Sequence, residues 1–105
     1  MTFLDLITYL AAQQPVEPLY RAHGVTPDTP GLAVYLGAAL RVDADIALLG
    51  VEATDGDLQY VQHGVQWLYC LELDLVEEMV ADGVAERASP VAIAARVLDY
   101  ACYDA

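Results

Sequence analysis

The longest run of regularly spaced apolar residues lies between Asp57 and Asp82. Apolar side chains recur there at spacings of three and four residues, which is the period of an amphipathic helix. The residues that follow this spacing are Leu58, Val61, Val65, Leu68, Val76 and Met79. Proline is absent from the stretch, and Gly83 directly after it suits a helix stop. The pattern predicts one long helix over residues 57–82, around which the rest of the chain packs.

Two shorter helices are predicted before this stretch, at the N-terminus. Thr2 and Asp5 have the spacing of a capping box, which indicates a helix that continues to about residue 13. Residues 16–23 can form a second, short helix with Leu19 and Tyr20 directed inward.

The remaining elements are also predicted as helices. Residues 31–40 are apolar on every side, as in a buried helix. Residues 46–51 form a short apolar run that can be a helix or a buried strand, and the lack of another evident strand favours helix. Ser89 and Pro90 have the order of a helix cap and first position. We therefore predict a single all-α domain over residues 1–105, a compact bundle of five or six helices.

Apolar side chains from all of these helices are expected to form the core. The predicted core residues are Leu6, Ile7, Leu10, Leu32, Val34, Leu36, Leu40, Leu49, Val61, Val65, Leu68, Val76, Met79, Val91, Val97 and Leu98.

One acidic residue conflicts with this arrangement, because Glu72 falls in the middle of the apolar face of the predicted long helix. A carboxylate in a core is costly unless it is paired or hydrogen-bonded. The simplest explanation of its position is a structural ion pair, with Arg41 as the candidate partner. A local shift of the helix that returns Glu72 to water explains it equally simply. An acid or metal ligand in a cleft is the functional alternative.

The composition is acidic and rich in apolar residues. Sixteen acidic residues and four arginines give a formal charge of −12, and lysine is absent. From Ala53 onward there are ten acids and two arginines. Such a field repels nucleic acid and anionic membranes and favours basic partners. The apolar fraction of 57% exceeds the usual ~45 to 50%, so part of it is available for an interface.

The sequence suggests a cytoplasmic protein. It begins without the pattern of a signal peptide, and its apolar runs are too short to span a bilayer. Free thiols at Cys70 and Cys102 are then the expected state, and a disulfide between them is the alternative.

The outer face of the predicted long helix has the composition of a protein interface. Aromatic residues and carboxylates lie together there, and tyrosine and tryptophan are enriched where proteins meet. The last helix adds further residues of the same kind. The candidate partner-binding residues are Tyr60, His63, Trp67, Asp74, Glu77, Glu78, Asp99, Tyr100 and Tyr103. The alternative is that Tyr60 and Trp67 flank an internal contact and that the acids form a solvated face.

Three functions follow from these observations. The leading hypothesis is a non-enzymatic protein-binding module, for example an inhibitor or immunity-type protein directed at a basic, nucleic-acid-binding protein. The alternative is a structural or regulatory homodimer that uses the apolar excess. A small metal-dependent enzyme is the weakest, since it rests only on Glu72 and on His63, Cys70 and Asp74 along one helix face. Because no arrangement of a nucleophile with a base stands out, we expect no enzymatic activity, cofactor or metal.

Overall fold

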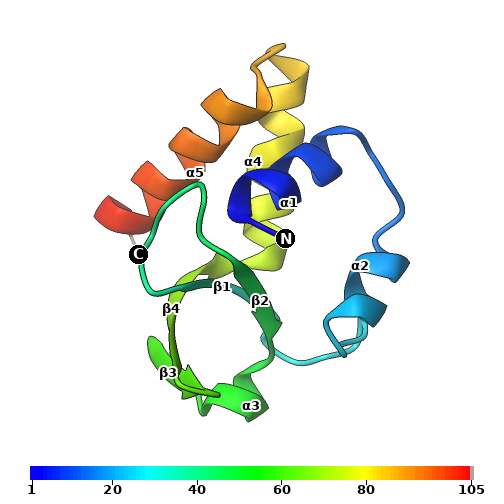
Figure 1. Cartoon of the computed structure of the whole chain (residues 1–105). Coiled ribbons are helices and arrows are strands. Elements are labelled where there is room, and N and C mark those ends of the chain that lie inside the picture. The colour runs from blue at the N-terminus through cyan, green and yellow to red at the C-terminus, as the bar shows by residue number, and fades with distance from the viewer. Residues whose placement is uncertain (105) are drawn as a thin grey trace.

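The computed structural model of the chain describes the backbone of residues 1–104 and the side chains of residues 1–102. It combines helices with strands, so the prediction of an all-α bundle is wrong. The elements, in chain order, are α1 (Phe3–Ala11), α2 (Glu17–Ala22), β1 (Ala33–Gly37), β2 (Ile46–Leu49), α3 (Val51–Thr54), β3 (Gln59–Gln62), β4 (Val65–Glu72), α4 (Leu73–Ala85) and α5 (Pro90–Asp104), as Figure 1 shows.

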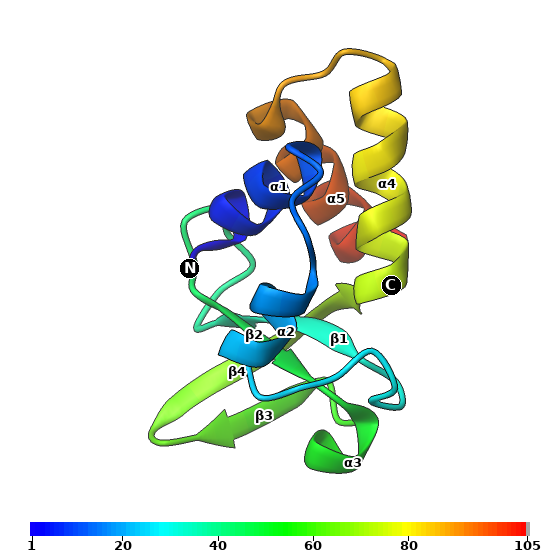
Figure 2. The same ribbon diagram turned by 90° about the vertical axis from the view of Figure 1, so that its right-hand side faces the viewer.

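The four strands form one antiparallel sheet in the order β2-β1-β4-β3. The central strands, β1 and β4, carry helices on one side, where α1, α4 and α5 pack against one another and against the sheet. The short helix α3 lies at the opposite end of the molecule, next to the hairpin of β3 and β4 (Figures 1 and 2). One face of the sheet is covered by these helices, and at β1 the other face is covered too, since Ala33 and Tyr35 are buried and the Tyr35 hydroxyl bonds Thr54 of α3.

The long helix predicted over residues 57–82 is replaced by a hairpin followed by a shorter helix. β3 and β4 are joined by the two-residue turn His63–Gly64, whose φ angles are 53° and 79°. Two left-handed residues make the turn type whose twist matches that of the flanking strands, and glycine adopts this conformation without strain. Only the end of the predicted stretch is helical, since α4 begins at Leu73.

The two short apolar runs before the hairpin are strands and not helices. β1 lies within residues 31–40, and β2 takes most of residues 46–51. Val34 of β1 pairs with Leu48 on one side and with Leu71 on the other, so each run has a partner. Four consecutive residues of β1 are buried, which removes the alternation by which an exposed strand is recognised.

The predictions that depend on local contacts are confirmed. The Thr2 hydroxyl accepts a hydrogen bond from the Asp5 backbone N–H at 3.1 Å, and the Asp5 carboxylate accepts one from the Thr2 backbone at 3.0 Å. The Ser89 hydroxyl accepts from the Ala92 backbone at 3.2 Å, directly before α5. Leu19 and Tyr20 of α2 are buried, as expected.

The core lies between the three large helices and the sheet. Its fully buried members include Phe3, Leu6, Ile7, Val34, Leu36, Val76, Ile93 and Val97. Three predicted core residues are exposed, since Val61, Val65 and Val91 are 68%, 39% and 60% exposed. Leu49 and Leu68 are half-buried but do not belong to the core cluster. Val61 and Val65 belong to the hairpin, which extends past the helices (Figure 2). Val91 lies in the first turn of α5, on its exposed side.

Helices α4 and α5 approach each other most closely at Gly83. A Cβ atom on this glycine would lie 2.5 Å from Cγ1 and 2.8 Å from Cδ1 of Ile93, which is only 1% exposed. Ile93 is enclosed by the core and has little room to move, so the contact depends on the absence of a side chain at position 83.

We predict that Gly83→Ala lowers the free energy of unfolding by about 1 to 3 kcal/mol, because overpacking outweighs the gain in helix propensity. Urea unfolding followed by circular dichroism measures the change. The same substitution in an Ile93→Ala background should be neutral or stabilising, since the clash is then absent. Stabilisation by Gly83→Ala in the wild-type background would contradict the close approach.

A second prediction concerns the hairpin turn. Gly64→Ala should destabilise the protein by about 1 to 2 kcal/mol, because an L side chain is strained at positive φ. His63→Asn should instead stabilise the protein, by a smaller amount, because asparagine followed by glycine is the preferred pair in this turn. Both changes can be measured by urea unfolding. Equal effects of the two substitutions would show that the turn does not have this conformation.

Candidate functional site

The residues predicted to bind a partner, on the outer face of the long helix and on the last helix, are distributed over the hairpin, α4 and α5. Tyr60, His63 and Trp67 lie on the hairpin of β3 and β4, because this segment is not helical. Asp74, Glu77 and Glu78 lie on α4, and Asp99 and Tyr100 lie on α5. The side chain of Tyr103 lies outside the described residues. The structure therefore brings together the hairpin residues, but it does not combine all the candidates into one surface.

The predicted pair of Glu72 and Arg41 is wrong. Glu72 ends β4 and its side chain is exposed, so it needs no buried partner. Arg41 lies in the loop between β1 and β2, where its Nε atom is 3.0 Å from the Asp43 carboxylate. The other ion pair among residues 1–102 joins Arg96 and Glu86.

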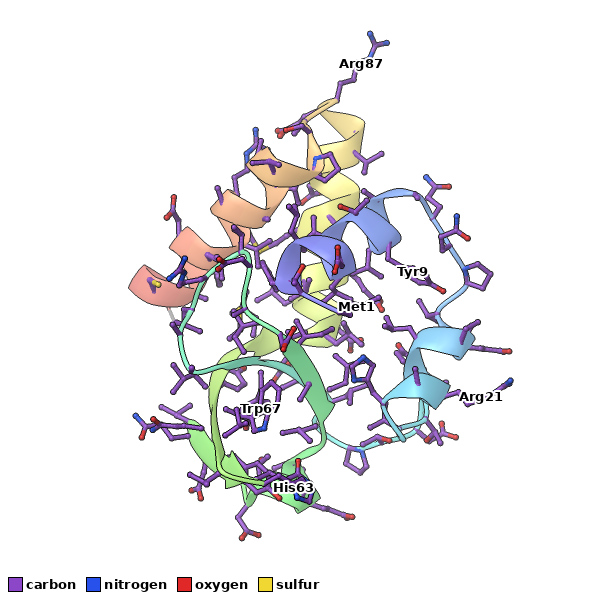
Figure 3. The ribbon with its side chains drawn as sticks, in the orientation of Figure 1. Met1, Tyr9, Arg21, His63, Trp67 and Arg87 are labelled. Carbon is purple, nitrogen blue, oxygen red and sulfur yellow. The ribbon has the colours of Figure 1, made fainter. Side chains whose placement is uncertain are left out.

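The three residues of the predicted metal site, His63, Cys70 and Asp74, do not lie on one helix face. His63 is in the exposed turn at the end of the hairpin (Figure 3), Cys70 is fully buried, and Asp74 is exposed on α4. Burial raises the pKa of the Cys70 thiol to about 12, which disfavours the thiolate form. Within the described part of the chain, no three His, Cys, Asp or Glu side chains form a group that could hold a metal ion. No helix among these residues is both long and apolar enough to cross a membrane.

The hairpin presents an open strand edge at one side of the sheet. β3 is the last strand of the sheet. Gln62 and Val65 flank the turn as a hydrogen-bonded pair, and the Tyr69 N–H donates to the Leu58 carbonyl at 2.8 Å. In an antiparallel pair the direction of the backbone groups alternates, so the N–H and C=O groups of Gln59 and Val61 point away from β4.

The outward backbone groups of β3 have no partner in the described part of the chain, where no hydrogen bond outside the β3–β4 ladder reaches the backbone of Gln59 or Val61. The opposite edge of the sheet differs. There the Phe3 N–H donates to the Ala44 carbonyl and the Ile46 N–H donates to the Met1 carbonyl, so the N-terminal segment covers the start of β2. Proteins usually protect open edges with lysine, proline or a bulge. β3 contains none of these.

Exposed apolar side chains border this open edge. Leu58 and Val61 are each 68% exposed, and Val65 is 39% exposed. Tyr60 faces Trp67 across the hairpin, and both rings are half-buried. We call Leu58, Tyr60, Val61, Val65 and Trp67, together with the β3 backbone, the hairpin surface.

The hairpin surface is also free of charge in a strongly acidic chain. From Leu58 to Leu71 there is no Asp, Glu, Lys or Arg, although the chain as a whole has a formal charge of −12. Acidic residues stand just outside, at Asp57 and Glu72. Figure 3 shows Arg21 and Arg87 directed away from the hairpin, at the side and the far end of the molecule. An uncharged, partly apolar strand edge is typical of a surface that pairs with another chain.

Aromatic side chains join the base of the hairpin to the centre of the sheet. Tyr35 of β1 and Tyr69 of β4 lie edge to face with ring centres 5.7 Å apart. The Tyr35 hydroxyl donates to the Asp57 carbonyl at 2.7 Å, which ties the loop before β3 to the sheet. Trp67 lies over Gly37, where a Cβ would come within 3.3 Å of its ring. These contacts hold the edge of β3 in a defined position.

The signal for this surface was present in the sequence. The segments Gln59–Gln62 and Val65–Tyr69 contain aromatic and β-branched residues and are separated by two residues that end in glycine. This is the pattern of a hairpin with a two-residue turn. The helical spacing of Leu58, Val61 and Val65 obscured it.

On α4, the candidate residue Glu77 faces inward rather than toward solvent. Its Oε1 atom is buried without a hydrogen-bond partner, and its side chain lines a pocket of about 170 Å³ between α1 and α4. Burial raises the pKa of the Glu77 carboxyl, and the Asp74 carboxylate adds to this effect, whereas hydrogen bonding to Tyr20 opposes it. Glu77 is therefore a partly buried acid within the fold.

This environment predicts a pH-dependent stability difference. A carboxyl whose pKa is raised on folding stabilises the folded state at pH values below its unfolded pKa, and this contribution is lost as pH rises through the folded pKa. Glu77→Gln should therefore be more stable than wild type at pH 7, and the difference should vanish near pH 3. Glu78→Gln, which removes the same charge from an exposed neighbour, is the control in urea unfolding. Equal gains from both substitutions would show that only net charge matters.

Comparisons of the chain with protein-family models, with curated proteins and with solved structures find no match.

Proposed function

We propose that this protein is a non-enzymatic protein-binding module, in which a strand of the partner pairs with the outer edge of β3. The observation that supports the proposal is the open edge itself, with the unpaired backbone groups of Gln59 and Val61 and the exposed side chains of Leu58 and Val61 beside them. Strand addition of this kind uses backbone hydrogen bonds for affinity and the alternating side chains for specificity.

The expected affinity follows from the size of the edge. Each backbone hydrogen bond contributes about 0.5 to 1.5 kcal/mol net, and full burial of a valine or leucine side chain contributes about 1.5 to 3 kcal/mol. The cost of association offsets much of this gain. A single added strand is a small interface, so we expect micromolar rather than nanomolar binding.

Two kinds of partner strand fit this edge. The net charge of the whole chain favours a basic protein, and the absence of charge in the hairpin favours a second copy of the chain. The formal charge of −12 steers basic proteins toward the molecule, and Asp55 and Asp57 stand directly before β3. An inhibitor or immunity-type protein against a basic, nucleic-acid-binding target is the heterologous binder that this charge favours. The uncharged segment from Leu58 to Leu71 instead favours a second copy of the chain.

A titration with model peptides tests the strand-addition function. Trp67 is the single tryptophan, and it pairs with Tyr60 of β3, so its fluorescence reports on the edge. An eight-residue peptide of alternating valine and lysine should produce a saturable change with a dissociation constant below about 1 mM. The effect should weaken with added salt.

Matched controls separate strand pairing from simple charge attraction. The same peptide with N-methyl groups on alternate residues keeps its charge but loses its hydrogen bonds, so it should not bind. Val61→Pro removes an outward N–H and should abolish binding, while proline is tolerated on an edge strand. Circular dichroism confirms that this variant is folded. Unchanged binding in both controls would overturn the proposal.

A further inference from the structure

We infer that the strand which pairs with β3 is the β3 strand of a second copy of this chain, antiparallel and centred on Tyr60. This inference rests on the proposed strand-addition function and names its partner. The resulting homodimer contains one continuous eight-stranded sheet, with β3 of each copy at its centre. The contact is two-fold symmetric, so each copy uses the same residues.

The backbone geometry selects the register. Only Gln59 and Val61 of β3 direct their backbone groups outward. When the two strands are centred on Tyr60, Gln59 of one copy meets Val61 of the second copy, and the reverse pair forms as well. All the outward groups of both strands are then hydrogen-bonded, and the two Tyr60 residues face each other as a non-hydrogen-bonded pair.

The neighbouring registers leave groups unpaired. A contact centred on Gln59 would require Val61 to pair with Asp57, whose N–H already donates to the Thr54 carbonyl at 3.0 Å. A contact centred on Val61 would require Gln59 to pair with His63, which lies in the turn with a φ of 53°. The register centred on Tyr60 avoids both conflicts.

The side chains and charges agree with this register. Tyr60 packs against Tyr60 of the second copy, with Trp67 of each copy beside it, and such aromatic cross-strand pairs stabilise sheets. Two chains that each have a formal charge of −12 repel each other, but their uncharged hairpins are the segments that meet. Asp57 of one copy also comes next to His63 of the second copy, which is the one basic group of the hairpin.

The association state tests the inference. Sedimentation velocity from about 10 µM to about 1 mM should show a concentration-dependent dimer, as expected for a small interface. Val61→Glu should weaken dimerisation by at least tenfold. Val91→Glu adds the same charge at a valine of similar exposure on α5, so it should dimerise like wild type. A wild-type monomer at 1 mM, or equal dimerisation of the two variants, overturns the inference.

Disulfide trapping tests the register independently of how tightly the dimer forms. In a Cys102→Ser background, Tyr60→Cys places two thiols at a directly opposed pair, about 4.5 Å apart between Cα atoms, which a disulfide can bridge. Gln62→Cys is the control, because its two thiols lie about 13 Å apart along the strands in this register. Faster crosslinking of Gln62→Cys than of Tyr60→Cys contradicts the register.

Peptide binding and association state together separate a failure of the homodimer from a failure of strand addition. A monomer that still binds the valine and lysine peptide, and loses this binding in Val61→Pro, overturns the homodimer but keeps strand addition, and it points to a basic heterologous partner. A monomer that does not bind the peptide overturns both. A dimer that Val61→Glu does not disturb shows that another surface joins the copies.

Discussion

The pairing of β1 with β4 is the interaction on which the rest of the structure depends. These two strands form the middle of the sheet, and Val34 and Leu36 of β1 with Cys70 and Leu71 of β4 provide the floor for the helices. The register shifts between Val34 and Tyr35, so that both Cys70 and Leu71 reach the core. A bulge of this kind bends and twists a strand locally. It also separates β4 into one part that supports the helices and one part that continues into the hairpin.

This division explains why the two halves of β4 have different roles. Toward its end, β4 is covered by α4 and α5 and contributes buried apolar side chains. Toward its beginning, β4 pairs with β3 on one side and with the end of β1 on the other, but its side chains are partly or fully exposed. Apolar residues that a larger core would enclose are therefore left at an edge. Three of the exposed large apolar side chains, Leu58, Val61 and Val65, lie where the sheet has no further strand.

Local structure could be predicted from the sequence, whereas the sheet could not. The Thr2 and Ser89 caps are contacts between residues three positions apart, so they can be predicted from the neighbouring residues alone. Val61, Val65 and Leu68 have helical spacing in a segment that forms strands, and four buried residues of β1 show no alternation. In the hairpin, the two-residue turn His63–Gly64 is a local signal that competes with this spacing, whereas for β1 the choice between helix and strand requires knowing that residues 33–37 meet residues 67–72. These paired residues are 30 to 39 positions apart, and no local pattern encodes their contact. The same limit applies to the candidate site, since Tyr60 and Trp67 were assigned to a helix face, whereas the open edge of β3 follows only from the sheet order.

The bulge at Cys70 has a consequence for the chemistry of the two thiols. Cys70 is fully buried against the helices, and Cys102 is exposed on α5. A thiol reagent therefore meets Cys102 directly, but it reaches Cys70 only when β4 separates from the helices above it. The rate at which Cys70 is alkylated then measures how often the centre of the sheet opens, and Cys102 supplies the internal standard for the reagent. The chain thus contains a natural reporter of its own local unfolding.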